Sequence, residues 1–191
     1  MAEWVLDVER AYVTAATDAR TRASIARDPA AADDVRRAKA LAAIGAVASH
    51  YLAVGTPRSL GLVIDAATLG GGALSLEAHR TWFAPVDVRC HDTAGGAIVD
   101  GARATSLAEA LACDIVCIHV PIAIASSAIR RGTHLNVLAS MELPAELASV
   151  AAISREVPDL GALAAGFVDG RQLDEITVLL AGDAAIALAA I

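Results

Sequence analysis

Two side chains that could exchange protons follow two apolar segments of the chain. Asp65 comes directly after the apolar run Leu60–Ile64, and His119 falls near the end of the apolar run 114–120. If both runs are strands of a doubly wound parallel sheet, they lie side by side. We therefore expect Asp65 and His119 at one crevice, where a histidine beside a carboxylate is a typical general acid/base pair. The alternative is that Asp65 caps a helix and that a partly buried His119 bonds to the backbone.

The three cysteines have a simpler interpretation. Cys90, Cys113 and Cys117 lie in apolar runs, and three thiols cannot pair completely. Cys117 and His119 share one face of their strand, which is the spacing a Cys–His nucleophile could use. Packing is the better interpretation, because free cysteine behaves as a small buried hydrophobic residue. Reduced thiols are typical of a cytoplasmic protein.

The remaining polar residues give weaker signals. Asp92 ends the second predicted strand, where a ribose-binding carboxylate would lie, although a turn residue before 93–96 is the simpler interpretation. We expect His50 and His79 on helix surfaces. Since no element carries histidines and carboxylates at metal-ligand spacing, we expect no metal.

The elements that must position these residues alternate along the chain. Apolar runs predict strands at 60–64, 86–90, 114–120, 133–138, 150–153 and 175–180, and periodic segments predict helices at 1–28, 33–54, 71–83 and 106–112. Strands without polar alternation that are separated by helices are typical of a parallel sheet covered on both faces. We therefore predict an α/β fold, a Rossmann-like doubly wound parallel sheet with two leading helices. The expected organisation is a helical N-terminal segment, 1–57, and a Rossmann-like domain, 58–191.

Composition excludes several classes of protein. The 191-residue chain is 56% hydrophobic and 3% aromatic, with a net charge of −7. The charge gives no electrostatic reason to bind nucleic acid, and few rings are present to stack on bases. The uncharged stretch 40–57 is rich in alanine and glycine, so we interpret it as a buried helix rather than a membrane span.

Several segments resemble the ornithine cyclodeaminase/mu-crystallin family. Residues 130–137 (RRGTHLNV) are similar to its G-T/A-H-x-N strand, and residues 170–182 resemble its carboxyl end. Residues 42–63 resemble the helix that leads into its first Rossmann strand, and 106–121 fits its A-D-I-V strand, as well as a similar stretch of 2-hydroxyacid dehydrogenases. The resemblance covers roughly residues 38–191. It implies NAD(P)(H)-dependent enzymes that act on amino acids or cyclic imines, usually dimers with a separate substrate domain, which we expect to be largely missing here.

Two binding elements of that family are altered. The arginine that holds the substrate carboxylate should align with Ala40, whereas Arg37 and Lys39 are near it but out of register. The glycine-rich dinucleotide turn is replaced by 64–66 (Ile-Asp-Ala), and the glycines 70–72 come too late unless the turn is rebuilt. A carboxylate roughly 4 Å from a diphosphate near a protein surface is repelled by about 4 kcal/mol.

The family's catalytic region is altered as well. Its catalytic aspartate should lie near 139–141 (Ala-Ser-Met), and Glu142 is the nearest carboxylate. Ser140 and Glu142 could bind substrate or transfer protons, or they could start a helical turn. Asn136 resembles a family residue, as does Arg171, which could bind a carboxylate or pair with a neighbouring aspartate.

These departures favour an enzyme that has lost its nicotinamide cofactor. The leading hypothesis is a repurposed, cofactor-independent enzyme that performs acid/base cyclisation, isomerisation or elimination on a small organic substrate, in specialised (natural-product) metabolism. The first alternative is an NAD(P)H-dependent imine reductase or ornithine cyclodeaminase, and the second is a non-catalytic partner protein. We expect a cytoplasmic homodimer. The expected site comprises catalytic Asp65, His119 and Glu142 and substrate-binding Ser140, Asn136 and Arg171.

Overall fold

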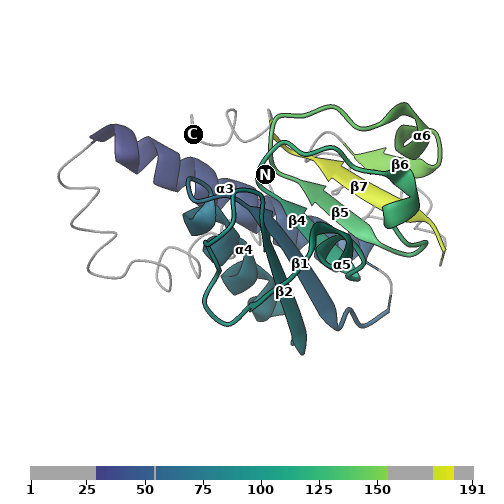
Figure 1. Ribbon diagram of the computed structural model, residues 1–191, viewed down its shortest axis with the longest axis horizontal. Helices are drawn as coiled ribbons and strands as arrows, with labels where there is room; N and C mark the ends of the chain where they lie inside the picture. Colours follow the sequence, from purple (N-terminus) through teal and green to yellow (C-terminus); the bar gives the residue numbers. More distant parts are fainter. Residues whose placement is uncertain (1–28, 54, 155–173, 183–191) are drawn as a thin grey trace.

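A computed structural model describes residues 29–53, 55–154 and 174–182 (Figure 1). The helix expected over 1–28 and Arg171 lie outside these ranges. In chain order the elements are α3 (Pro29–Leu52), β1 (Ser59–Ile64), α4 (Leu69–Trp82), β2 (Asp87–Asp92), β3 (Arg103–Ala104), α5 (Leu107–Leu111), β4 (Ile115–Ile118), a 3-10 turn (Ser126–Ala128), β5 (His134–Val137), α6 (Ala145–Ala148), β6 (Ala151–Ser154) and β7 (Ile176–Leu180).

The strands form one seven-stranded sheet in the order β3-β2-β1-β4-β5-β7-β6. Every strand pair in it is parallel. The chain fills one side of β1 first and then crosses to β4 on its other side, which is the doubly wound arrangement. The predicted α/β Rossmann-like fold is therefore confirmed. The sequence did not predict β3 or α6, which have two and four residues.

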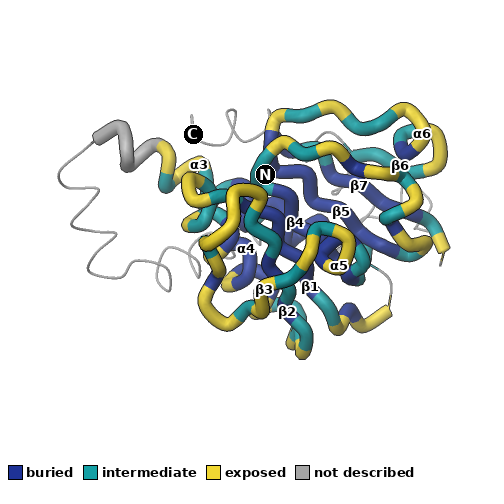
Figure 2. Tube along the Cα trace, viewed as in Figure 1, coloured by how far each residue is buried: buried dark blue, intermediate teal, exposed yellow. Residues whose placement is uncertain are grey.

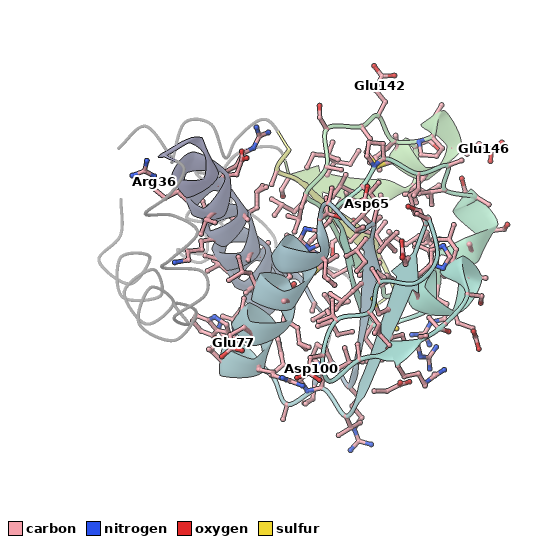
Figure 3. The ribbon with its side chains drawn as sticks, turned by 60° about the vertical axis from the view of Figure 1, so that its left-hand side comes forward. Arg36, Asp65, Glu77, Asp100, Glu142 and Glu146 are labelled. Carbon is pink, nitrogen blue, oxygen red and sulfur yellow. The ribbon has the colours of Figure 1, made fainter. Side chains whose placement is uncertain are left out.

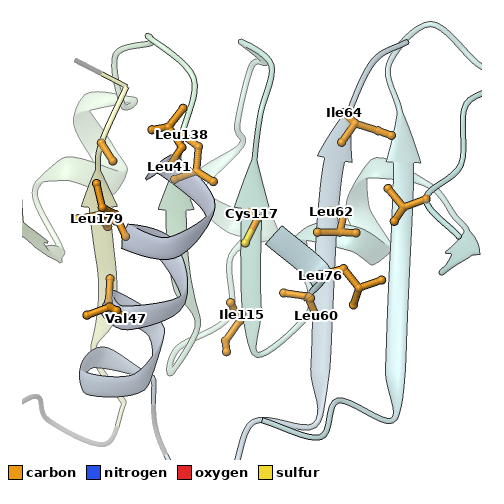
Figure 4. Close-up of a cluster of buried hydrophobic side chains, with 14 of the residues drawn as sticks. Leu41, Val47, Leu60, Leu62, Ile64, Leu76, Ile115, Cys117, Leu138 and Leu179 are labelled. Atoms are coloured by element: carbon orange, nitrogen blue, oxygen red, sulfur yellow. The ribbon is translucent and has the colours of Figure 1, made fainter. Parts of the chain in front are cut away.

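Alternate residues of the strands pack against different helices. Leu60, Leu62 and Ile64 belong to a buried cluster with residues of α3 and α4 (Figure 4). Val63 points to the opposite face, into a second cluster that includes residues of α5 and α6. The central strands are buried along almost their whole length (Figure 2). Because both faces are covered, the strand sequences lack the polar alternation of a half-exposed sheet.

Small residues let the helices approach one another. Ala42 and Ala46 of α3 and Ala78 of α4 are completely buried in the contact between the two helices. The alanine-rich composition thus serves close packing.

On the other face of the sheet, Ser106 starts α5 with the capping box that the sequence predicts. Its hydroxyl accepts from the Glu109 N–H, and the Glu109 carboxylate accepts from the Ser106 N–H.

The edge of the sheet where the strands begin is held together by Asp114. Its carboxylate accepts the backbone N–H groups of Arg58 and Ser59, both at 2.9 Å, and the Ser59 hydroxyl at 2.8 Å. Arg130 adds an ion pair at 3.1 Å. Because these partners join the starts of β1, β4 and β5, the interactions stabilise the end of the fold opposite to the crevice.

Helix α3 lies directly on the sheet. Thr177 of β7 donates to the Leu52 carbonyl at 3.2 Å, and Asn136 of β5 donates to the Ser49 hydroxyl at 2.8 Å. The described part of α3 is thus a layer of the sheet domain. A domain boundary between residues 57 and 58 stays a prediction. Within the described ranges, no helix is long and apolar enough to cross a membrane.

Candidate functional site

The crevice of this fold lies where β1 and β4 end side by side. Strand β1 pairs with both β2 and β4, and the backbone N–H of His119 donates to the Val63 carbonyl at 2.9 Å. Asp65 and His119 each follow the last residue of their strand. The predicted adjacency of the two strands is confirmed. Ligands of open α/β sheets bind at this point, where the chain switches sides.

Asp65 uses its side chain to build the turn before α4. One carboxylate oxygen accepts the backbone N–H of Thr68 at 2.8 Å and the Thr68 hydroxyl at 2.9 Å. The Thr68 hydroxyl in turn accepts the backbone N–H of Asp65 at 2.9 Å. These hydrogen bonds lower the pKa of Asp65. Asp65 thus shapes the turn that leads into α4, whose N-cap residue is Thr68, and it does not cap the helix itself.

His119 is half-buried and its imidazole lies against the first turn of α4. Nδ1 is 3.0 Å from the point where a Cβ on Gly71 would lie. Nε2 is enclosed and has no hydrogen-bond partner among the described residues. Burial, with a smaller contribution from the neighbouring His79, lowers the pKa of His119 to about 4. The ring is therefore neutral at pH 7 and a weak base.

Asp65 and His119 lie at the same edge without a hydrogen bond between them in the described part of the chain. The side-chain hydrogen bonds of Asp65 go to Thr68. His119 instead interacts electrostatically with His79. Their cooperation as an acid/base pair stays a prediction.

The three glycines at 70–72, which follow β1 later than a dinucleotide turn would, lie in the first turn of helix α4. Gly72 lies so close to β1 that a Cβ would be 2.8 Å from Ile64 Cγ2, whereas a Cβ on Gly70 would meet nothing within 4 Å. The first N–H groups of a helix have no partner within it, and its N-terminus favours anions. Residues 65–68 form the connection between β1 and α4, and the glycines place backbone without side chains in the first turn of the helix.

Asp92 lies beside this helix end, on the neighbouring strand. It is the last residue of β2 and pairs in register with Ile64. Its carboxylate accepts the backbone N–H groups of Ala94 at 2.9 Å and Ala97 at 2.6 Å, and these hydrogen bonds lower its pKa. An acid at this position of a Rossmann fold can accept a hydrogen bond from a ribose hydroxyl. The α4 glycines and Asp92 together fit a dinucleotide.

A second group of candidates lies where β5 and β7 end. Gly182 packs so tightly there that a Cβ would be 2.6 Å from the Ala139 carbonyl oxygen and 2.9 Å from the Ser140 nitrogen. Ser140 and Glu142 are both exposed on the loop after β5. Figure 3 shows Glu142 projecting outward from that loop. The expected catalytic region is thus at the carboxyl edge, with its carboxylate facing solvent.

Arg37 reaches the same edge from α3, and sequence reasoning did not select it. Its Nη2 donates to the Gly182 carbonyl at 3.1 Å. Arg37 forms no ion pair with any carboxylate of the described residues. It precedes Ala40, the position of the family arginine, by three residues and so lies near the same helix face. That helical spacing was the signal available in the sequence.

Asn136, expected to bind substrate, lies instead in a buried polar network beneath α3. Its Nδ2 donates to the Ser49 hydroxyl, and its Oδ1 accepts from Nε2 of His134 at 3.0 Å. The other nitrogen of His134 is 2.8 Å from the Thr177 hydroxyl. All four side chains are completely or almost completely buried. Asn136 therefore joins the helix to the sheet inside the core.

His79 extends this network into α4, and its expected position on a helix surface is wrong. Its Nδ1 is 2.7 Å from the Ser75 carbonyl oxygen, and its Nε2 is 2.9 Å from the Ser49 hydroxyl. Only 1% of the residue is exposed, and this burial lowers the pKa of His79 to about 4. The sequence placed His79 on a helix but not on its inner face.

The cysteines are buried free thiols, as expected from their apolar surroundings. Burial raises the pKa of Cys117 to about 12, so its thiol is not a nucleophile at neutral pH. Among the described residues, no three His, Cys, Asp or Glu side chains are grouped as metal ligands.

Comparison with solved structures supports the fold and corrects the cofactor. No protein-family model and no curated protein sequence matches the chain. It is similar to an archaeal alanine dehydrogenase dimer with bound NAD, with 22% identity, a TM-score of 0.59, and 78% of this chain and 61% of that chain covered. It is also similar to a Thermococcus litoralis Δ1-pyrroline-2-carboxylate reductase in complex with NADH and L-proline, with 20% identity, a TM-score of 0.60, and 81% and 64% covered.

A probable ornithine cyclodeaminase from Bordetella pertussis is similar as well, with 22% identity, a TM-score of 0.58, and 80% and 64% covered. The chain thus spans less than two thirds of the length of each of these structures. The expectation that no cofactor is used is wrong, because structures with this fold hold NAD or NADH. The chain has the Rossmann-like fold of these ornithine cyclodeaminase-like structures, and the expected resemblance is confirmed at the level of the fold.

Proposed function

We propose that this chain binds a nicotinamide dinucleotide and belongs to an NAD(P)H-dependent reductase or cyclodeaminase that acts on an amino acid or a cyclic imine. The observation that carries the proposal is the position of two features at neighbouring strand ends: the glycine-rich first turn of α4 after β1, and the carboxylate of Asp92 at the end of β2. Gly70–Gly72 lie in the first turn of α4, which begins at Leu69 beside the end of β1, and Asp92 ends β2 in register with Ile64. The similar structures that hold NAD or NADH support the same assignment.

The residues of this chain would divide the binding between them. Backbone N–H groups in the first turn of α4 would hold the phosphates, as helix N-termini do for anions. Asp92 would accept hydrogen bonds from ribose hydroxyls, and its negative charge would oppose a 2′-phosphate. NADH should therefore bind more tightly than NADPH. When bound, the nicotinamide would supply a hydride to the substrate.

Arg37 is the proposed carboxylate-binding residue of the substrate site. Its guanidinium uses one N–H for the Gly182 carbonyl, so its other donors are available to a substrate. Ser140 and Glu142 lie on the loop beside this contact, and we assign them to substrate binding and proton transfer. His119 is a further candidate for proton transfer at the neighbouring crevice.

Titration of the purified full chain with NADH and with NADPH, followed by nucleotide fluorescence, tests the dinucleotide site. We expect micromolar binding of NADH and weaker binding of NADPH. Asp92→Asn should weaken NADH binding and reduce the preference for NADH over NADPH. Asp100→Asn removes the same charge from an exposed acid outside the crevice and should change neither. If neither nucleotide binds at millimolar concentration, the proposed function is wrong.

A second experiment tests the substrate site with the amino acid that the similar reductase structure contains. With NADH present, L-proline should bind to the chain and protect it from thermal unfolding. Arg37→Gln should weaken this binding about ten- to hundredfold, because hydrogen bonds to charged groups contribute about 1.5–3 kcal/mol. Arg58→Gln, an exposed arginine at the opposite edge of the sheet, is the control. Equal effects of the two variants would exclude Arg37 from the site.

We also infer that the protein is a homodimer, as the alanine dehydrogenase with the same fold is. Light scattering of the purified chain over a range of concentrations tests this assignment. A mass of one chain at every concentration would contradict it.

A further inference from the structure

Gly182 is the point where two parts of the chain meet at the carboxyl edge of the sheet. It is buried and comes directly after the end of β7 and Ala181. Its carbonyl accepts Nη2 of Arg37, an exposed residue of α3, at 3.1 Å. A Cβ on Gly182 would lie 2.6 Å from the Ala139 carbonyl oxygen and 2.9 Å from the Ser140 nitrogen. One residue thus contacts both the cation of α3 and the loop after β5.

The strands below this point are held in register by backbone hydrogen bonds. Val137 of β5 pairs with Leu180 of β7, and the N–H of Ala181 donates to the Val137 carbonyl at 3.0 Å. On the other side of β5, the N–H of Ala139 donates to the Ile118 carbonyl at 3.1 Å. Because these bonds hold the strands up to Ala181 and Ala139, a side chain at position 182 would displace the residues that follow them.

A side chain on Gly182 could not rotate away from the loop. The three atoms nearest to its Cβ position are the carbonyl carbon and oxygen of Ala139 and the nitrogen of Ser140, which all belong to one peptide group. A Cβ attached at this position would press on backbone atoms, and a packed interior has no spare room to receive it. Either Ser140 or the carbonyl that holds Arg37 would therefore move.

We propose that Gly182 is a positioning residue of the substrate site, which brings Arg37 and the loop of Ser140 and Glu142 to one place. The inference rests on the proposed function, in which Arg37 binds the substrate carboxylate. A guanidinium held through one N–H keeps a defined direction for its other donors. Groups that are ordered before the ligand arrives lose less freedom on binding. The missing side chain at position 182 thus serves substrate binding as well as packing.

Helix α3 has its own attachment to the sheet, so a change at Gly182 should not release it. Asn136 of β5 donates to the Ser49 hydroxyl at 2.8 Å, and Thr177 of β7 donates to the last carbonyl of α3 at 3.2 Å. These contacts begin about three helical turns after Arg37. A methyl group at position 182 should therefore disturb the Arg37 contact while the helix stays on the sheet.

NMR of the full chain without any ligand tests the contact itself. Arg37→Gln removes the guanidinium from the Gly182 carbonyl and should shift the amide signals of Gly182 and Ser140 together. Lys39→Gln removes a positive charge two residues further along the same helix and should leave both signals in place. If Arg37→Gln also leaves them unchanged, the contact does not position the loop and the inference is overturned, whatever the protein binds. Since Arg37 is exposed, this variant should fold.

Gly182→Ala tests the role of the contact in binding. With NADH present, L-proline should bind about tenfold more weakly or worse, because a displaced Arg37 loses its hydrogen bonds to the carboxylate. The affinity for NADH should stay unchanged. Gly61→Ala is the matched control, since a Cβ on Gly61 would also press on a backbone carbonyl, that of Ala110 in α5. It should destabilise the chain without weakening L-proline binding more than NADH binding.

The outcomes separate this role from the proposed function. If the wild-type chain binds neither NADH nor L-proline, the proposed function is wrong and the role of Gly182 in substrate binding is wrong with it. If the wild-type chain binds both and Gly182→Ala weakens both equally, or weakens neither, only the role of Gly182 is wrong. A selective loss of L-proline binding, together with the shifted Ser140 signal in Arg37→Gln, supports it.

Discussion

Two histidines whose pKa is lowered by burial, His79 and His119, should make this fold sensitive to mild acid. Burial lowers the pKa of His79 and of His119 from 6.5 to about 4. In the unfolded chain both rings regain the ordinary value, so below about pH 6.5 the unfolded state binds more protons than the native state. The free energy of unfolding must therefore fall as the pH decreases from about 6.5 towards 4. Above about pH 6.5 these two histidines cause no change of stability with pH, because both states are then neutral.

The size of the effect follows from the two pKa values. Between pH 7 and pH 5, a histidine whose pKa falls from 6.5 to about 4 loses about 2 kcal/mol of stabilisation. Two such groups lose about 4 kcal/mol together, and the repulsion between their charges adds to the cost of the second proton. That loss is a large part of the roughly 5–15 kcal/mol by which a domain is stable.

Urea unfolding between pH 7 and pH 5 measures this loss. His79→Gln should lower stability at pH 7, because the contacts with Ser49 and Ser75 are disturbed, but should remove about half of the pH dependence. His50→Gln replaces an exposed histidine whose ring lies 4.3 Å from that of Trp82, and should leave the pH dependence unchanged. If His79→Gln keeps the wild-type pH dependence, buried neutral His79 is not its source.

Three further substitutions test the geometry of the crevice. Gly72→Ala places a Cβ 2.8 Å from Ile64 Cγ2, and overpacking of this kind should cost about 1–3 kcal/mol in urea unfolding. Gly71→Ala should displace the His119 ring, seen as a shift of its NMR signals, because a Cβ would lie 3.0 Å from Nδ1. Asp65→Asn should loosen the start of α4, measured as faster amide hydrogen exchange at Thr68, since the amide that replaces the carboxylate is a weaker acceptor.

The sequence predicted the fold better than the direction of individual side chains. Continuous apolar strands determine the parallel sheet, and their order places the ends of β1 and β4 together, as observed. Periodicity could not show which face of a helix turns inward when both faces are small and apolar. His79 was therefore expected at the surface, and Asn136 was assigned to substrate although it binds Ser49 inside the core. Such a network depends on three-dimensional register, which no local pattern encodes.

The altered turn also shows why residue types alone misled the cofactor assignment. A carboxylate after β1 looks incompatible with a diphosphate, because repulsion at roughly 4 Å near a surface amounts to about 4 kcal/mol. In the structure the carboxylate of Asp65 accepts the N–H and the hydroxyl of Thr68 within its own turn, which fixes its position, and these bonds lower its pKa, so its charge remains. Helix α4 then begins at Leu69, and the backbone N–H groups of Leu69, Gly70 and Gly71 form its anion-favouring end, because Gly72 donates to the Thr68 carbonyl. The inserted turn separates two roles that adjoin in a G-x-G turn: Asp65 shapes the connection, and in the proposed dinucleotide site the backbone at Gly70 and Gly71 would face the phosphates.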